Sequence, residues 1–240
     1  MDELINKRPI LIVANSSLYL LHYRKILIKI IGKNNHVITI SPIDKATKEL
    51  SKISIHLPWS IKRKYDLSAI SFVISFFKLL FLVRAIKPKL IHAHTLKTNL
   101  IVSIVSSLYG IPCILSFTGL GILSKSRQYN IIFKTILKTI IFFSIRHFKG
   151  GFSFKRNDQR SRFIFQNIKD KEYLESITKS KIKHLSETIY GSGIPKQYFS
   201  VAKKKKFNWE SNKEKSMPKI HFLYCARSVS YTHLRAHETS

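Results

Sequence analysis

Side chains suited to ligand binding follow two short apolar stretches near the middle of the chain. The stretches are Leu90–His92 and Ile111–Phe117. An imidazole can hydrogen-bond a ligand hydroxyl, an ammonium group can meet a phosphate, and glycine lets the backbone approach a ligand closely. We therefore expect a site for a hydroxylated or phosphorylated ligand. Its candidate residues, at or just beyond the ends of the two stretches, are His92, His94, Thr95, Lys97, Thr118, Gly119 and Gly121.

These residues can meet only if the two stretches are neighbouring parallel strands. Pro88 favours the end of a preceding helix, so a strand is expected to begin near Lys89. Apolar residues recur at helical spacing within Thr98–Tyr109, and Gly110 follows where a helix would end. Strand, helix and strand make a βαβ unit with parallel strands. The fold class predicted is therefore α/β, a Rossmann-like doubly wound sheet, whose ligands gather at the carboxyl ends of the strands.

Each candidate has a structural alternative. His92 and His94 alternate around the sheet, so one of them is expected to pack in the core, and His94 is the stronger functional candidate. Backbone N–H groups of the segment 118–121 are expected to bind a phosphate or an acceptor oxygen, or else to form an ordinary strand-ending turn. The chain has no G-x-S-x-G motif, which argues against a hydrolase.

The first strand and helix supply further candidates. Pro9–Ala14 is expected to be a strand, and the helix after it is expected over Leu20–Gly32. The turn between them lacks G-x-G-x-x-G, so we expect no dinucleotide there. Asn15 and Arg24 are candidate substrate contacts, with a helix cap and a surface arginine as the alternatives.

The rest of the chain continues the alternation of strands and helices. Gln166 and Asn167 follow a strand and are candidate substrate contacts, with backbone hydrogen bonding in the loop as the alternative. Lys149–Arg162 is expected to be a loop, and Asp66 is expected to cap a helix that reaches Ile86. The other predicted strands are His36–Ser41, Ile53–Trp59, Phe163–Gln166 and Glu187–Tyr190, and the other predicted helices are Ile131–Phe148 and Asp170–Thr178.

The charge is extreme: the 240 residues carry a formal net charge of +29, with 45% hydrophobic residues. Such a chain is globular and attracted to an anionic partner, whether nucleic acid, an acidic membrane leaflet or a phosphorylated substrate. We interpret Leu67–Ile86 as a buried or membrane-touching helix, since Lys78 and Arg84 interrupt it. The cysteines Cys113 and Cys225 have no metal-type spacing, and no secretory signal peptide is visible.

Ordered sequence segments carry a family resemblance. KPKLIHAHTLKTN resembles "RPDIVHTHTPKPN", GIPCILSFTGLG resembles "GIPVVATVTGLG", FIFQNIKDKEYL resembles "VIFQNEDDRELF" and IYGSGIPKQYF resembles "IPGSGVDLERF". Together with YLLHYRKILIKIIGKNNHVITISP, they are similar to the N-terminal domain of family 4 retaining glycosyltransferases of the capsule, O-antigen and exopolysaccharide type. The likeness covers about residues 9–199.

The resemblance implies the N-terminal, acceptor-side half of a GT-B fold, in which two Rossmann-like domains face each other. It implies a nucleotide-sugar donor, usually a UDP-sugar, and an acceptor sugar on a lipid diphosphate. Catalysis would place His94 at the reacting centre, with Asn15, Arg24, Lys97, Thr118, Gly119, Gly121, Gln166 and Asn167 binding substrate. No metal and no other cofactor are implied. The enzyme would be cytoplasmic and peripheral on the anionic inner face of the cell membrane, and no nucleic acid is expected as a partner.

The carboxyl-terminal part departs from the family pattern. We expect a domain over 1–199, a basic linker over 200–218, and over 219–227 the first strand of a second, donor-binding domain that is truncated. Residues 228–240 resemble a translated sequencing adapter and are expected to be a non-native tail. Pro195 replaces an acidic residue, and the paired-glutamate segment that grips the donor is missing. The chain alone is therefore expected to be inactive, and the alternative is a non-catalytic basic module for membrane or nucleic acid.

Overall fold

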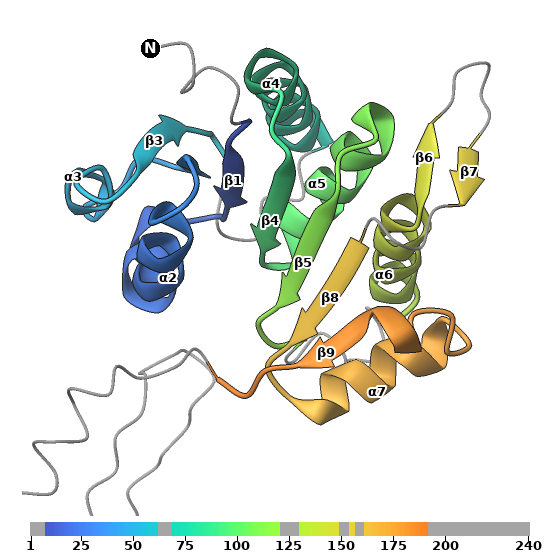
Figure 1. The fold of residues 1–240 in the computed structure, drawn as a ribbon. Coiled ribbons are helices and arrows are strands. Elements are labelled where there is room, and N and C mark those ends of the chain that lie inside the picture. Colours follow the sequence, from blue (N-terminus) through green and yellow to red (C-terminus); the bar gives the residue numbers. More distant parts are fainter. Residues whose placement is uncertain (1–7, 62–68, 121–129, 149–153, 157–160, 192–240) are drawn as a thin grey trace, which may run out of the picture. The chain divides into compact units, whose positions relative to one another are not determined.

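The fold is a seven-stranded sheet in which every neighbouring pair of strands is parallel. The computed structural model describes residues 8–61, 69–120, 130–148, 154–156 and 161–191. The strand order is β3-β2-β1-β4-β5-β8-β9 (Figure 1). Their bounds are β1 Ile10–Val13, β2 Val37–Ser41, β3 Ile55–Pro58, β4 Leu90–His94, β5 Cys113–Phe117, β8 Ser161–Phe165 and β9 Ser186–Thr188.

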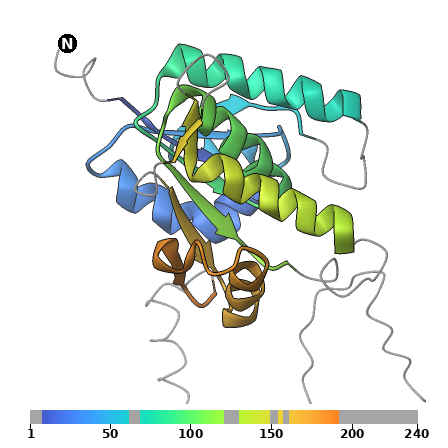
Figure 2. The ribbon, with the colours of Figure 1, turned by 90° about the vertical axis from the view of Figure 1, so that its right-hand side faces the viewer.

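Helices cover both faces of this sheet. Alternate residues of β1 belong to two separate cores, because Leu11 packs with α4, α5 and α6 whereas Ile12 packs with α2. The sheet therefore lies between two helical layers (Figures 1 and 2). The helices are α2 Ser17–Gly32, α3 Thr47–Leu50, α4 Ala69–Ile86, α5 Leu96–Tyr109, α6 Asn130–Ser144, α7 Ile168–Ile177 and the short 3-10 helix η3 Lys183–Leu185.

The strand order changes direction at β1. The chain first moves outward through β2 and β3, and it then returns to place β4 on the other side of β1. At such a switch the loops after the two strands diverge to opposite faces, which leaves a crevice at their carboxyl ends. The predicted doubly wound α/β fold is confirmed, and it puts Asn15, after β1, and His94, at the end of β4, on either side of this crevice.

Most predicted elements are present, with shifted ends. The predicted strand over His36–Ser41 is β2, the predicted edge strand is β3, and Gly110 ends α5 with a left-handed φ of 64°. Helix α2 begins at Ser17, three residues before the predicted start. Helix α3 was not expected from the sequence, because four residues are too few to show a helical period.

The predictions around residue 148 were wrong. The helix expected to reach Phe148 ends at Ser144, and Arg146–Phe148 forms strand β6. The segment expected to be a loop contains strand β7, Phe154–Arg156, which pairs antiparallel with β6, and the start of β8. Paired glycines between two short stretches are a hairpin signal. The boundary was missed because β6, Arg-His-Phe, has only three residues and continues the mixture of apolar and basic residues found in α6, so its pattern fits either structure.

Helix α4 is fixed to the sheet by hydrogen bonds as well as by packing. The fully buried Trp59 follows β3 and donates its indole N–H to the carbonyl of Ser75 at 2.9 Å. The Ser75 hydroxyl in turn donates to the carbonyl of Ser60 at 2.6 Å. These bonds hold the middle of α4 in a single position against the end of β3.

Several predicted features lie outside the described residues. They are the cap Asp66, the glycine Gly121, Cys225, the linker, the strand over 219–227 and the tail. Within the described ranges, no helix combines the length and the apolar content that a bilayer crossing requires.

The stacked rings of Phe117 and Phe165 offer a test of the core. Their centroids lie 5.1 Å apart with nearly parallel planes, and Phe165 is fully buried. We expect Phe165→Ala to lower the free energy of unfolding by about 3–5 kcal/mol, because it removes the ring and leaves a cavity. Urea denaturation measures the loss. The control Ile43→Ala, at a side chain 74% exposed, should change stability by less than about 0.5 kcal/mol, and an equal loss in both variants would contradict the assignment.

Candidate functional site

The crevice at the switch between β1 and β4 is built around His94. This residue ends β4, and helix α2 reaches over it from the other side of the switch. The Nε of Arg24 donates a hydrogen bond to Nδ1 of His94 at 3.3 Å. The ring of Tyr19 lies 5.7 Å from the His94 ring, and the Arg24 guanidinium lies 5.5 Å from the centre of the Tyr19 ring. The predicted candidates Arg24 and His94 are therefore brought together, with Tyr19 between α2 and the histidine.

His92 and His94 lie on the same face of the sheet. Their rings are 4.2 Å apart, and both side chains are buried. The expectation that the two alternate around the sheet was wrong, because residues two apart in a strand point to the same face. His92 bonds the hydroxyl of Ser116 through Nε2 at 2.8 Å. Hence His92 has a structural partner in β5, while His94 faces the crevice end of the strand.

Burial keeps both histidines neutral. Loss of solvent, together with the nearby Arg24, lowers the pKa of His92 to about 3. The pKa of His94 is also held well below its ordinary value, first by burial and then by the charges of His92 and Arg24. Because Arg24 donates to Nδ1, that nitrogen carries no hydrogen, and the neutral ring carries its hydrogen on Nε2. The N–H of His94 is therefore the hydrogen-bond donor that this ring offers on its Nε2 side.

Three buried polar atoms around this point have no hydrogen-bond partner among the described residues. They are the Tyr19 hydroxyl on α2, Nε2 of His94 on β4 and Oδ1 of Asn99 on α5. Asn99 uses its amide N–H to bond the carbonyl of Ser116 at 3.1 Å. A buried polar atom without a partner costs free energy, so such atoms commonly await a ligand or an ordered water. The sequence predicted His94 but not Tyr19, which lies just before the predicted start of its helix at Leu20, nor Asn99, which lies within the predicted helix Thr98–Tyr109.

Thr95 holds a strained backbone between His94 and α5. Its φ of 78° and ψ of 151° lie in a region that is essentially reserved for glycine. As the N-cap of α5, it makes no side-chain hydrogen bond to the first turn, and its hydroxyl bonds that of Thr98 at 3.2 Å. The first turn contains the half-buried Lys97 and no acidic residue. The N-terminus of α5, where the helix dipole is positive and Lys97 stands, thus lies at the crevice.

The other helix end at the switch is already filled by the chain itself. Ser16, not Asn15, is the N-cap of α2 and accepts the N–H of Tyr19. The carboxylate of Asp44 accepts the N–H of Leu18 at 3.0 Å and the hydroxyl of Ser16 at 3.0 Å. A carboxylate therefore stands where a dinucleotide-binding domain would hold a phosphate. The half-buried Asn15 is left beside the crevice without the capping role.

The remaining candidates lie further along the same edge of the sheet. Thr118 follows β5 and Gln166 follows β8, and the strand ends before them are paired in register. Gly119 has a φ of 113°, which few other residues adopt. The N–H of Leu120 donates to Asp170, so the turn is tied to the start of α7. Asn167 caps that helix through its Oδ1, and its amide N–H bonds Asp170 at 2.7 Å.

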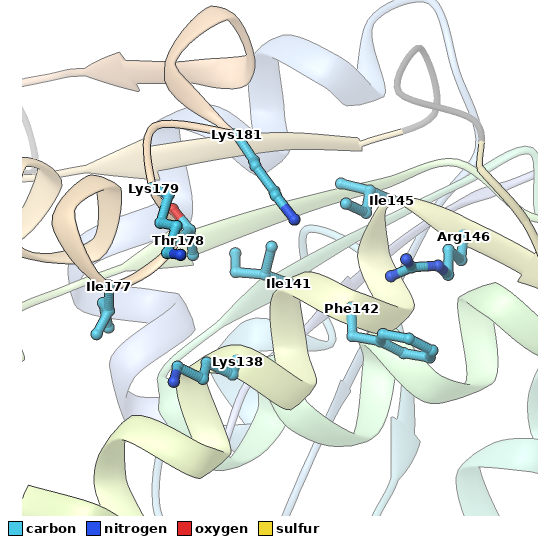
Figure 3. A pocket seen from close by; sticks show the side chains of 9 residues that line it. All are labelled: Lys138, Ile141, Phe142, Ile145, Arg146, Ile177, Thr178, Lys179 and Lys181. Carbon is cyan, nitrogen blue, oxygen red and sulfur yellow. The ribbon is translucent and has the colours of Figure 1, made fainter.

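A basic hollow of about 360 Å³ lies elsewhere, between α6 and the loop after α7. Figure 3 shows Lys181 pointing across it toward Ile141 and Ile145, and Arg146 lies 4.0 Å above the ring of Phe142. Both helices begin at the carboxyl edge, so their ends, which line the hollow, lie at the opposite edge. Cations at two helix C-termini have a structural explanation, since they offset the negative ends of the dipoles. The cationic residues of the hollow are Lys138, Arg146, Lys179 and Lys181.

Comparisons with known proteins agree with this fold. The sequence model of the family described as glycosyl transferase 4-like matches residues 9–145. No curated protein sequence matches the chain significantly.

Among solved structures, the Anabaena protein HepE in complex with UDP is similar at a TM-score of 0.51 and 12% identity, covering 82% of this chain and 49% of that one. UDP-N-acetylglucosamine 2-epimerase from Rickettsia bellii is similar at 0.51 and 15%, covering 83% and 48%. A glycosyltransferase from Rickettsia africae is similar at 0.50 and 15%, covering 82% and 46%. The chain thus spans about half the length of each of these structures.

We expect the two buried histidines to make stability fall in acid. Below pH 6.5 the unfolded chain protonates its histidines, whereas His92 stays neutral to about pH 3 and His94 also resists protonation. The unfolded state then binds more protons, so the free energy of unfolding falls by about 1.4 kcal/mol per pH unit for each histidine. The free energy of unfolding, measured by urea denaturation between pH 7 and pH 4.5, should fall less steeply with decreasing pH in His92→Gln than in the unsubstituted chain. The difference in slope should equal the contribution of one histidine. Equal slopes in the two proteins would contradict the assignment.

The strain at Thr95 predicts a stabilising substitution. Thr95→Gly removes about 1–3 kcal/mol of backbone strain from the folded state. It also lowers stability by about 0.4–1 kcal/mol, because glycine raises the conformational entropy of the unfolded chain. We therefore expect a net gain of about 1 kcal/mol in the free energy of unfolding. Thr95→Ala is the matched control, since it removes the hydroxyl but keeps a Cβ, and it should give no gain. A glycine variant no more stable than the alanine variant would contradict the strain.

Proposed function

This chain belongs to the glycosyl transferase 4-like family, and we propose on that premise that it is the acceptor-binding half of a two-domain enzyme. The enzyme transfers a sugar from a nucleotide-sugar, of UDP type, to an acceptor sugar carried on a lipid diphosphate. The products belong to bacterial surface polysaccharide, as the sequence resemblance to capsule, O-antigen and exopolysaccharide transferases implies. Fold similarity alone does not separate a transferase from an epimerase, since both kinds share it; the family match favours the transferase.

The observation that carries the proposal is the unpartnered Nε2 of His94. It is a buried donor at the crevice between β1 and β4, where ligands of such sheets bind. A neutral imidazole that donates from Nε2 fits a hydroxyl or another oxygen of a sugar. The buried Tyr19 hydroxyl offers a second polar group nearby, because its ring lies against His94. When a sugar fills the crevice, these atoms would gain hydrogen-bond partners, and those bonds would offset the desolvation penalty of burying them.

The catalytic contribution of this domain is positioning. In a transfer with retention, the acceptor hydroxyl attacks the anomeric carbon, the bond to the diphosphate breaks on the same face, and the acceptor proton leaves with the diphosphate. His94 is a poor general base for this step, because burial and Arg24 oppose its protonation. Its N–H would hold a sugar oxygen in place while charge develops on the leaving group. Arg24 keeps the imidazole in the donating tautomer.

Positive charge at the crevice supports a phosphorylated acceptor. Lys97 stands in the first turn of α5, which lacks an acidic residue, and Arg24 lies across the crevice. Both fit a diphosphate between lipid and sugar. Asn15, Thr118, Gly119 and Gln166 remain proposed substrate contacts along the same edge, whereas the amide of Asn167 already caps α7. Gly121 also remains a proposed contact, but it lies outside the described residues.

The donor would be bound mainly by a second domain. HepE, which is similar over about half its length, was crystallised with UDP, and this supports a UDP-sugar as donor here. The enzyme is proposed to work at the inner face of the cell membrane, where a lipid-linked acceptor resides.

We expect the 240-residue chain alone to transfer no sugar, because the donor is proposed to be bound mainly by a second domain, and the chain spans about half the length of the HepE structure it resembles. The test begins with the gene: its sequence past the codon for Arg227 should continue into a second Rossmann-like domain. That longer protein, incubated with radiolabelled UDP-sugars and lipid-linked acceptors, should form labelled lipid. His94→Leu should lower its kcat by about 10²-fold, as loss of a positioned donor does, while His94→Gln, which keeps an N–H donor, should retain part of the activity.

Three results would contradict the proposal. They are transfer by the 240-residue chain alone, a full-length protein inactive with every UDP-sugar, and equal activity of His94→Leu and the unsubstituted enzyme. Far-UV circular dichroism of both variants separates a lost contact from a lost fold.

A further inference from the structure

The basic hollow between α6 and the loop after α7 combines apolar and cationic side chains in one small space. Its volume of about 360 Å³ falls in the range of about 300–1,000 Å³ that is usual for small-molecule sites. Its lining contains no acidic residue. The apolar lining residues are Ile141, Phe142, Ile145 and Ile177, and the cationic ones are Lys138, Arg146, Lys179 and Lys181 (Figure 3). Such a lining suits a ligand that is itself partly apolar and partly anionic.

The helix dipoles explain only part of this arrangement. The effect of a dipole falls off within the last turn of a helix. Lys138 stands more than one turn before the end of α6 at Ser144, so it is too far from that end to be explained in this way. The dipoles also give no reason for cations to surround a hollow with an apolar floor. A ligand accounts for both features.

The positive charge of the hollow is not compensated by neighbouring carboxylates. In the part of the chain that the structure describes, the ion pairs join Lys52 to Glu49 and Lys171 to Glu175. None of the four cations of the hollow takes part in them. Like charges around one small space repel each other, so an anion placed among them would be attracted by all four at once.

Two of the cations are held in place before any ligand arrives. The guanidinium of Arg146 lies 4.0 Å from the centre of the Phe142 ring, which fixes its position over an apolar surface. The N–H of Lys181 donates to the carbonyl of Thr178 at 3.3 Å, and the next residue, Ile182, is fully buried. The Lys181 side chain therefore leaves an anchored backbone, and Figure 3 shows it crossing the hollow above the apolar floor.

The chemistry of these groups selects phosphate as the anion. A phosphate monoester carries nearly two negative charges at neutral pH and has three acceptor oxygens. A guanidinium can bond two of those oxygens at once, and lysines bind phosphate as point charges. The apolar floor adds a surface for the organic group of the ester. We propose that the basic hollow is a binding site for a small organic phosphate, a monoester whose phosphate meets Arg146 and Lys181 and whose apolar group covers Ile141 and Ile145.

This site is distinct from the crevice. The hollow lies at the opposite edge of the sheet from His94 and Lys97, because it is lined by the ends of α6 and α7 rather than by their starts. A ligand could therefore occupy the hollow while the crevice is filled. The proposal needs neither a sugar nor a donor-binding domain, so it does not rest on the proposed function.

Isothermal titration calorimetry of the 240-residue chain tests the proposal, with phenyl phosphate as the probe. At roughly 0.15 M salt, attraction to the general positive charge of the surface is largely screened. We expect one phenyl phosphate to bind per chain. Inorganic phosphate should bind about tenfold more weakly, since it has no apolar group to place on the floor, and phenol should give no measurable binding.

Variants locate the binding. The variant Arg146→Gln with Lys181→Gln should weaken phenyl phosphate binding by about tenfold or more, because it removes the charge-assisted bonds. Lys181→Gln alone, at an exposed side chain, should weaken it by about threefold or more. The matched control is Lys25→Gln with Lys29→Gln, which removes the same charge from exposed positions of α2 and should bind as the unsubstituted chain does. Thermal melts of all variants confirm that they fold.

Four results would overturn the proposal. They are absence of phenyl phosphate binding, equal affinity for phenyl phosphate and inorganic phosphate, equal losses in the hollow variants and the α2 control, and a loss in Lys97→Gln as large as that in the hollow variants. The last result would place the phosphate in the crevice. Failure of any of these tests leaves the sugar-transfer assay of the longer protein unaffected, and inactivity in that assay leaves the binding measured here unaffected.

Discussion

The candidate site depends on a single contact, the hydrogen bond from Arg24 to His94. It spans the switch in strand order, because Arg24 belongs to the helix after β1 and His94 ends β4. Burial excludes the imidazolium, so the arginine meets a neutral ring and fixes which nitrogen carries the hydrogen. Tyr19 holds the guanidinium from the same helix. Without this contact either tautomer would be available, and the direction of the donor in the crevice would be undefined.

The sheet was predictable from the sequence because its central strands are covered on both faces. Such strands read as near-continuous apolar runs, and Ile10–Val13 is of this kind. The apolar residues of Leu90–His94 and Cys113–Phe117 are interrupted by histidine or serine. The hairpin of β6 and β7 was not predictable, since each strand has only three residues, too few to show the alternation of a strand. At the site, residue type and position relative to the predicted strands were enough to indicate His94 and Arg24 as candidates. It could not indicate Tyr19, Asn99 or Asp44, because their roles arise from contacts between elements that the sequence does not pair.

The positive charge of the chain has more than one structural role. At the carboxyl edge, Arg24 sets the state of a histidine. At the opposite edge, Arg146, Lys179 and Lys181 follow the ends of α6 and α7, where cations offset the negative ends of the helix dipoles. On α4, two cations accompany exposed apolar side chains. A net charge of +29 therefore does not by itself indicate a nucleic-acid partner, because some of these cations have local structural roles.

Asp44 has a consequence for selectivity among the nucleotides of the cell. Its carboxylate bonds the first turn of α2 as part of the folded chain, so it competes intramolecularly with any free anion for this helix end. A dinucleotide cofactor, however abundant, would have to displace a neighbouring loop before its pyrophosphate could bind. The domain thus keeps the ancient nucleotide-binding architecture while its first turn is closed to nucleotides, and the crevice stays available for a different ligand.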